Sequence, residues 1–313
     1  MIKDKNEYLA AKKRTQIGNI IFNLINAIVL TLLVVVTVYP FWNTIAISFN
    51  DGLDAIAGKI HLWPRKFTWQ NYKALFTTGQ IFNAFVISVT RTLLQSVLSV
   101  FCTCMLAYAL SRKEYVLRKP LTSVLVVSMY VSAGLIPSYM LIKNLGMLNS
   151  YWVYIIPNLV DVFNFILVRT YINGLPDSFV ESARIDGANE FKIFLGIIFP
   201  LIIPSVAMIC LFVAVGAWNS WFDTYLYTSA KPNLYSLQYV LMQFLNSSQN
   251  QSNSAADANS MAVAAAAGSS GSMVTPITLR SSITVIATVP ILVVYPFMQR
   301  YFVVGMTIGG VKE

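Results

Sequence analysis

Six long runs of apolar residues limit what this chain of 313 residues can fold into. Each run has about 20 residues or more, which is the length that a helix needs to cross roughly 30 Å of hydrocarbon. Backbone groups inside a bilayer must be hydrogen-bonded within the protein, so the runs are expected to be helices rather than strands. We predict an all-α polytopic membrane protein with six transmembrane helices, over about residues 20–48, 82–110, 121–142, 152–172, 197–222 and 281–304.

The composition excludes a water-soluble globule. Charged residues make up 11% of the chain and apolar residues 56%, whereas a soluble domain has about 25% charged residues. One core in a chain of this length cannot bury so many apolar side chains, and a bilayer removes the need to do so.

Lysine and arginine residues indicate the orientation, because short loops that carry them stay on the cytoplasmic side. The segments on the side of the amino terminus carry 14 of these residues and the opposite segments carry seven. We therefore predict that both termini are cytoplasmic. The same asymmetry accounts for the net charge of +9, which indicates no nucleic-acid partner. The predicted organisation is a cytoplasmic segment 1–19, a transmembrane domain 20–304 with a cytoplasmic loop 173–196 and external loops 50–81 and 223–280, and a cytoplasmic tail 305–313.

The external loops are expected to hold short helices. Helical turns are expected near Trp63 and over 69–76, and spaced apolar residues predict a surface helix over 235–245. Residues 246–275 are rich in Ser, Asn, Ala and Gly and are not expected to support a core, with a helix over 258–267 as the alternative.

The cytoplasmic loop combines charge with helical signals between two apolar runs. Ser178 and Glu181 have the spacing of a capping box, in which each side chain accepts from a free amide at the start of a helix. Gly187 permits the positive φ that ends a helix. A second helical stretch is expected over 189–198. Two interpretations remain open, a solvated connector and a surface that another protein binds.

Several motifs resemble those of ABC importer permeases. The pattern Glu-Ser-Ala-x₂-Asp-Gly-Ala begins at Glu181 and is followed by Ile197-x-Phe199-Pro200. It is similar to the family's loop signature, from which it departs at Ser182, where the family has Ala, and at Phe199, where the family has Leu. Further stretches resemble the maltose-permease-like carbohydrate branch, and most closely the subfamily for complex oligosaccharide and polysaccharide-derived sugars: 107–115, 134–152, 175–191 and 296–312.

The resemblance implies a type I ABC importer permease fold and a set of partners. The chain would form half of a translocation pathway for carbohydrate, in particular oligosaccharide, in a bacterial plasma (inner) membrane. Its partners would be a second, homologous permease, two ATPase subunits that bind ATP and Mg, an extracellular solute-binding protein and membrane lipid. The chain itself would hold no cofactor and would not be an enzyme.

The same resemblance implies that the first helix of the loop docks on the ATPase. Small residues there allow close approach, and carboxylates can accept charged hydrogen bonds from a partner's Arg or Lys. Pro200 and Pro204 are expected to bend or stiffen the fifth span, although packing-compensated kinks are the alternative. The predicted coupling residues are Ser178, Glu181, Ala183, Arg184, Asp186, Gly187, Ala188 and Pro200.

Polar residues at membrane depth are candidates for the pathway. Asn158, Asp161 and Asn164 have the spacing of one helix face, and Asp161 is expected to pair with Arg91 of the second span. An interhelical clasp is the alternative. Trp218, Asn219 and Trp221 are candidates at the external end of the fifth span, where an interfacial aromatic belt is the alternative.

The sequence offers no energy source or catalytic group of its own. It contains no phosphate-binding Gly-x₄-Gly-Lys-Ser/Thr loop, and its one histidine, His61, excludes histidine triads and histidine-based metal sites. We therefore predict no catalytic residue and no metal site. The alternative function is a secondary transporter driven by an ion gradient, with Asp161 as its coupling site.

Overall fold

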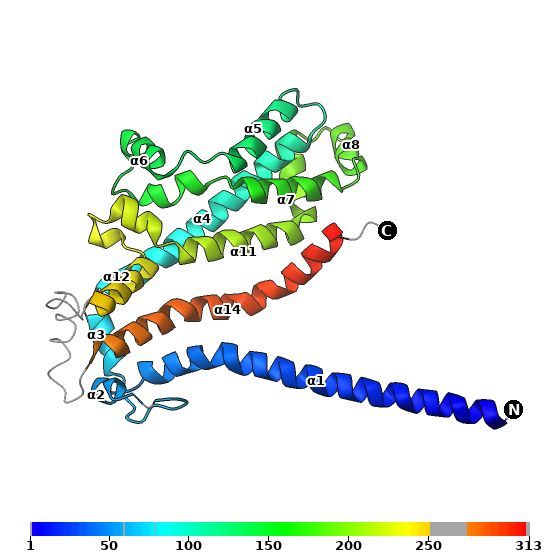
Figure 1. Ribbon diagram of the computed structural model, residues 1–313. Helices are drawn as coiled ribbons and strands as arrows, with labels where there is room; N and C mark the ends of the chain where they lie inside the picture. The colour runs from blue at the N-terminus through cyan, green and yellow to red at the C-terminus, as the bar shows by residue number, and fades with distance from the viewer. Residues whose placement is uncertain (1, 59, 78, 251–273, 311–313) are drawn as a thin grey trace. The chain divides into compact units, whose positions relative to one another are not determined.

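The computed structural model describes residues 2–58, 60–77, 79–250 and 274–310, and these are helical with short connections (Figure 1). Among them the one pairing of β type is an isolated bridge between Asn50 and Phe67. The predicted all-α class is therefore confirmed for the described part of the chain. The alternative helix over 258–267 lies outside these residues, as does the end of the predicted tail.

The chain divides into two compact units. The first contains residues up to Tyr72 together with the first part of α14 (Pro276–Gly310), as far as Val285. The second contains the chain from Lys73 onwards and the rest of α14. Each unit is described by itself.

In the first unit, α1 (Ile2–Ser48) is longer than the predicted span, because it begins before residue 20. It is followed by α2 (Gly52–Ile56), which the sequence did not predict, and by α3 (Gln70–Thr77), where helical turns were expected. The prediction of helical turns near Trp63 was wrong, since residues 60–66 form bends and no helix. None of residues 19–45 is buried, which suits a helix surrounded by lipid or by another subunit. Asn71 is fully buried and donates to the carbonyls of Ser48 and Asn50, so it joins the start of α3 to the end of α1.

In the second unit, the central helix is α4 (Gln80–Ser111), which packs on α7 (Val162–Asn173) and α11 (Ile203–Asn219). The main core lies between these helices and α8 (Ser178–Ile185) and α9 (Glu190–Ile193). The remaining elements of this unit are α5 (Arg118–Tyr130), α6 (Leu135–Asn144), η1 (Tyr151–Tyr154), η2 (Ile156–Asn158), η3 (Phe194–Ile198), α10 (Phe199–Leu201), η4 (Thr224–Thr228), η5 (Pro232–Leu234) and α12 (Leu237–Asn250).

Three of the predicted continuous spans are interrupted. The run 121–142 stops at Tyr130 and resumes at Leu135 after Gly134, whose φ is +86°. The run 152–172 begins as two short 3-10 helices and bends by 44° before α7. The run 197–222 bends by 83° at Ile202. The breaks in the runs 121–142 and 152–172 were not predicted, because apolar composition does not report on backbone breaks, whereas a bend in the run 197–222 was expected at its prolines.

The bend at Ile202 has a local cause. Pro204 has no N–H to donate to the carbonyl of Pro200, four residues earlier, and Pro200 itself cannot donate to Gly196. The helix relieves the second loss by widening into the π-helix η3, as helices do around such defects. The expected bending role of these prolines is confirmed.

The described helices do not by themselves give six spans. Three are long and apolar enough to cross a membrane, at Asn19–Ser48, Gln80–Ser111 and Pro276–Pro296. The number rises to five if each of the two bent pairs counts as one span. The surface helix predicted over 235–245 is present as α12, which extends to Asn250.

Candidate functional site

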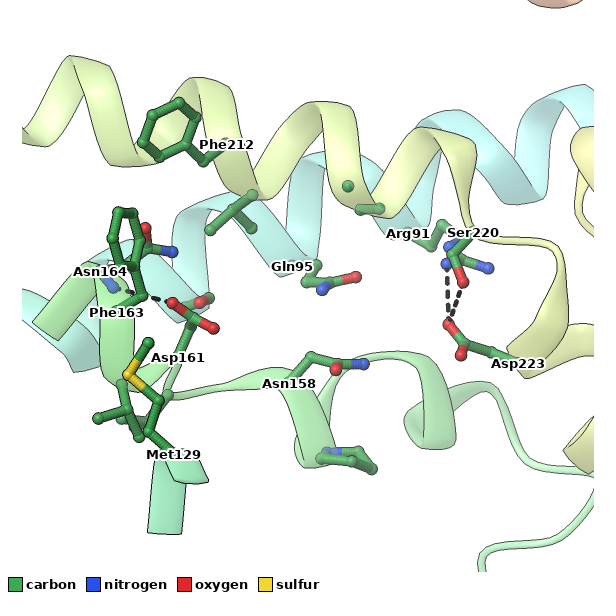
Figure 2. Close-up of a pocket in the computed structure, with 17 residues that line it drawn as sticks. Arg91, Gln95, Met129, Asn158, Asp161, Phe163, Asn164, Phe212, Ser220 and Asp223 are labelled. Atoms are coloured by element: carbon green, nitrogen blue, oxygen red, sulfur yellow. Dashed lines mark hydrogen bonds and ion pairs between the residues drawn. The ribbon is translucent and has the colours of Figure 1, made fainter. Parts of the chain in front are cut away.

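A polar cavity of about 830 Å³ lies beside α4, α7 and α11 (Figure 2). Its apolar wall includes Met129, Phe163 and Phe212. Guanidinium, amide, hydroxyl and carboxylate groups line it as well, and a wall of this mixed kind suits a ligand with many hydroxyl groups. These polar residues are Arg91, Gln95, Ser99, Asn158, Asp161, Asn164, Ser220 and Asp223.

Arg91 of α4 is the most buried charge in this wall, with 1% of its side chain exposed. Its Nη2 lies 3.3 Å from Asp223 Oδ2, which also accepts a hydrogen bond of 2.7 Å from the Ser220 hydroxyl. The predicted pairing of Arg91 with Asp161 was wrong. Asp223 follows the carboxyl end of α11 and reaches Arg91, whereas Asp161 lies farther along the cavity, beside Asn164 (Figure 2). Within the described chain, Nε and Nη1 of Arg91 have no hydrogen-bond partner.

Tyr154 holds Arg91 from its other side. The guanidinium carbon lies 4.5 Å from the centre of the tyrosine ring, which is a cation–π contact. The hydroxyl of Tyr154 is fixed by the hydroxyls of Thr224 and Thr228 in η4 and donates to the carbonyl of Leu234. The cation is thus held between an anion and an aromatic face.

The three polar residues of the fourth run do line the cavity, but they do not share one helix. Asn158 ends η2 and donates to the carbonyl of Tyr154, Asp161 precedes α7, and Asn164 lies in its first turn. Asp161 Oδ1 accepts from the amide of Asn164 at 2.8 Å, so it caps α7. The helix face predicted from their spacing was wrong, because the chain is extended at Asp161.

The aromatic candidates near the end of α11 lie elsewhere. Trp218 is buried, and its Nε1 donates to the carbonyl of Ala287 in α14 at 2.9 Å. Asn219 accepts from the side chain of Gln238, and the ring of Trp221 meets those of Phe222 and Tyr225. None of the three lines this cavity, whereas Ser220, between them in sequence, does.

The charged loop is built around α8. Gly187 has a φ of +78° and ends this helix, as the sequence predicted. The amide of Gly187 donates to Arg184 and that of Ala188 to Ala183, which together form a Schellman motif. The predicted capping box at Ser178 and Glu181 was wrong, since Asp177 occupies the cap position and the amide of Glu181 bonds to its backbone carbonyl.

One face of α8 is buried and the other is free in this chain. Val180 and Ala183 are buried against the core of the second unit. Phe179 and Ile185 are exposed, and Ile185 shows 87% of its surface. Glu181 and Asp186 are exposed as well. Pro200 lies outside this loop, in α10, before the bend at Ile202.

A network of charges fixes the other side of the loop. Arg184 donates to Glu114 at 2.6 Å and to Glu190 at 2.8 and 3.0 Å, and Glu190 accepts from the Tyr108 hydroxyl at 2.6 Å. Lys113 lies 2.6 Å from Asp177. The hydrogen bond from Arg184 lowers the pKa of Glu114 to about 2, and the two carboxylates raise the pKa of Arg184. The hydrogen bond from Lys113 lowers the pKa of Asp177.

The sequence interpretation did not identify several members of both sites. In the cavity these include Gln95 and Asp223, and in the loop they include Tyr108, Glu114 and Glu190. One signal was available, since an arginine within a span is usually paired, and Asp223 directly follows the predicted fifth span.

Comparison with known proteins gives consistent matches. Residues 161–308 match the family described as binding-protein-dependent transport system inner membrane component. The polygalacturonan/rhamnogalacturonan transport system permease protein YtcP of Bacillus subtilis (strain 168) is 34% identical over 294 residues, which cover 94% of this chain and 99% of YtcP. Protein LplC of the same strain is 34% identical over 292 residues, which cover 93% and 95%.

A solved structure shares the fold. The crystal structure of a bacterial ABC transporter involved in the import of the acidic polysaccharide alginate contains a chain with a TM-score of 0.81 and 25% identity. The match covers 91% of this chain and 98% of the other. The similarity therefore takes in most of the chain, including the region of the cavity and of the α8 loop.

Proposed function

Since the chain belongs to the family of inner membrane components of binding-protein-dependent transport systems, we propose that it is one permease subunit of an ATP-driven importer of oligosaccharides. Its fold is of the type I ABC importer permease kind. The observation that carries the proposal is the arrangement along α4. This helix lines the polar cavity at Arg91 and, through Tyr108 and Glu190, contacts the loop that presents α8.

The proposed topology has six spans with both termini in the cytoplasm. α5 and α6 together make the third span, each bent pair makes one span, and the other three are single helices. The excess of Lys and Arg on one side supports this orientation. It places the α8 loop in the cytoplasm and the loops 50–81 and 223–280 outside.

The proposed coupling surface is the free face of α8. Its exposed apolar side chains Phe179 and Ile185 lie beside the carboxylates of Glu181 and Asp186, a combination that fits a cleft lined by apolar and basic groups of an ATPase. Moving a two-state transporter from 1:99 to 99:1 takes about 5.5 kcal/mol of differential binding. We infer that two ATPase subunits, which bind ATP and Mg, supply it through α8.

The proposed substrate is a hydroxyl-rich sugar delivered by an extracellular binding protein and passed between this subunit and a second permease. YtcP is named as a permease of a polygalacturonan/rhamnogalacturonan transport system, and the solved relative is involved in the import of the acidic polysaccharide alginate. In this chain Arg91 is already paired with Asp223, and Asp161 adds a second carboxylate. This wall therefore favours hydrogen bonding to hydroxyl groups over attraction of a sugar carboxylate.

The test uses the full complex in proteoliposomes, with ATP inside and the binding protein outside. Uptake is measured for a set of neutral and galacturonate oligosaccharides. Gly187→Asp should abolish uptake while the subunit remains assembled in the membrane, because it changes the end of α8. Gly146→Asp is the matched control, since Gly146 also has a positive φ, of +68°, and open space around its Cβ position. It should retain uptake.

Two outcomes would overturn the proposal. One is full uptake with Gly187→Asp in an intact complex. The other is uptake without nucleotide on an ion gradient that is lost with Asp161→Asn, which would establish the secondary transporter instead.

A further inference from the structure

A segment of the first unit folds back along the end of α1. The indole of Trp42 donates to the carbonyl of Leu62 at 2.7 Å. The side-chain amide of Asn43 donates to the carbonyls of Ile60 and His61 at 2.7 and 3.1 Å. We propose that this segment, residues 60–69, is an anchor that inserts into the boundary between phospholipid headgroups and acyl chains beside α1.

The length of α1 sets the depth of the contact. The apolar part of the helix runs from Asn19 to Ser48, which is 30 residues and about 45 Å at 1.5 Å per residue. The hydrocarbon layer takes about 20 of these residues. A crossing that starts between Asn19 and Asn23 therefore ends between Val38 and Trp42, which is the level at which residues 60–62 are bonded.

The side chains of the segment suit that level. Trp63 has 71% of its surface exposed, and Leu62, Phe67 and Trp69 are each more than half exposed. A soluble surface seldom leaves apolar groups of this size uncovered together, whereas tryptophan is enriched at membrane interfaces. The segment also carries Arg65 and Lys66 and contains no acidic residue itself. Arg65 lies 3.5 Å from Asp54 of α2 but keeps 51% of its side chain exposed, so both cations favour contact with phosphate groups.

The segment is rigidly held, so its exposed side chains have fixed positions. The amide of Lys66 donates to the buried side chain of Asn50, and the amide of Thr68 donates to the carbonyl of Phe49. The rings of Phe49 and Phe67 stack at 5.6 Å. Because the segment is joined at one end to α1 and at the other to the two residues that directly follow it, its insertion would fix the depth of a helix that buries none of residues 19–45 in its own chain.

Two leucines of this unit provide a matched test. Leu62 is 55% exposed and lies beside Trp42, whereas Leu53 is 58% exposed and lies in α2, beyond the end of α1. In the full complex with its three cysteines replaced by serine, Leu62→Cys and Leu53→Cys are each given a nitroxide label. Relaxation by oxygen and by a water-soluble nickel complex is then compared in phospholipid bilayers, with Trp63→Cys as a second site in the segment.

The labels at residues 62 and 63 should show at least threefold higher ratios of oxygen to nickel relaxation than the label at residue 53. Equal, water-like ratios at all three sites would overturn the proposal. Labels at 62 and 63 that lose nickel contact only after the solute-binding protein is added would also overturn it, and would assign the segment to protein docking.

The depth measurement does not depend on the substrate or on coupling to the ATPase. The proposed topology puts residues 50–81 outside and so assigns the anchor to the outer leaflet. A membrane-impermeant maleimide added outside tests that assignment separately at Leu53→Cys. A failure of the anchor is thus distinguishable from a failure of the proposed function.

Discussion

The ion pair in the cavity and the ion pairs of the α8 loop join the same chemical groups in opposite surroundings. Arg91 is 1% exposed, and Asp223, its one anionic partner in the described part of the chain, is 26% exposed. Arg184 is 36% exposed and is shared by Glu114 and Glu190, which are more exposed still. A buried charge depends strongly on its partner because water cannot replace it, whereas exposed pairs contribute little and are screened by salt.

The comparison shows that α4 carries a rigid contact at one position and contacts that can rearrange at another. Arg91 and Tyr108 lie 17 residues apart on α4, which is about 25 Å along the helix axis. At one end the buried pair resists rearrangement, and at the other the exposed pairs can break and re-form at small cost. This difference suits the proposed coupling, in which the loop follows a partner while the wall of the cavity keeps its shape.

The largest expected effect comes from Asp223→Ala, which leaves Arg91 buried without its anion. The free energy of unfolding should fall by about 3–5 kcal/mol, as it does when one member of a buried pair is removed. Denaturant titration in mixed micelles measures this. The double variant Arg91→Met, Asp223→Ala removes both charges and should lose less than the single one. A single-variant loss no greater than that of the double would remove the contrast between the two regions.

A smaller effect is expected from Tyr154→Phe. The ring beneath Arg91 stays, but the hydroxyl that joins Thr224, Thr228 and the carbonyl of Leu234 is lost. Leaving such buried groups unsatisfied costs about 1–3 kcal/mol. Tyr151→Phe is the matched control, because the buried Tyr151 hydroxyl has no hydrogen-bond partner among the described residues. Its unfolding free energy should stay unchanged, and equal losses in the two variants would contradict the role of Tyr154.

The sequence predicted the parts of the fold that depend on local signals. Apolar length located α4 and α14, and Gly187 ended α8 because only glycine adopts a positive φ without strain. It did not locate the breaks near Gly134 and before Asp161. Membrane helices tolerate proline and glycine where neighbouring groups satisfy the freed backbone, so the same residues can leave a span intact or divide it.

The site was less predictable, because it depends on distances that sequence spacing does not give. Asp161 and Asp223 lie 70 and 132 residues from Arg91, and neither number says which carboxylate is nearer in space. Asp161 was predicted to pair with Arg91 because it lies well inside an apolar run. In the structure its side chain caps α7 instead. The exposed network was equally hard to predict from spacing, since Arg184 bonds to Glu114, which lies 70 residues away in the sequence.

The smallest expected effect is that of Glu114→Gln, and it depends on pH. Hydrogen bonding to Arg184 holds the pKa of Glu114 at about 2 in the folded protein, below the ordinary value of 4.5. A carboxyl whose folded pKa is lowered stabilises the protein above its unfolded pKa, and that contribution is lost as the pH falls toward the folded value. Because the pair is exposed, the difference from the native protein should stay below about 1 kcal/mol.

Melting temperatures of native and Glu114→Gln protein, measured from pH 8 to pH 3, test this expectation. The difference between the two melting temperatures should be constant down to about pH 5.5 and should narrow progressively as the pH falls below about 4.5. It should also be smaller in about 1 M salt, because exposed charges are screened. The loss caused by Asp223→Ala should hardly respond to the same salt, since water and ions reach Arg91 poorly. A Glu114→Gln effect that widened on acidification, or an Asp223→Ala effect that disappeared in salt, would place the two ion pairs in similar surroundings after all.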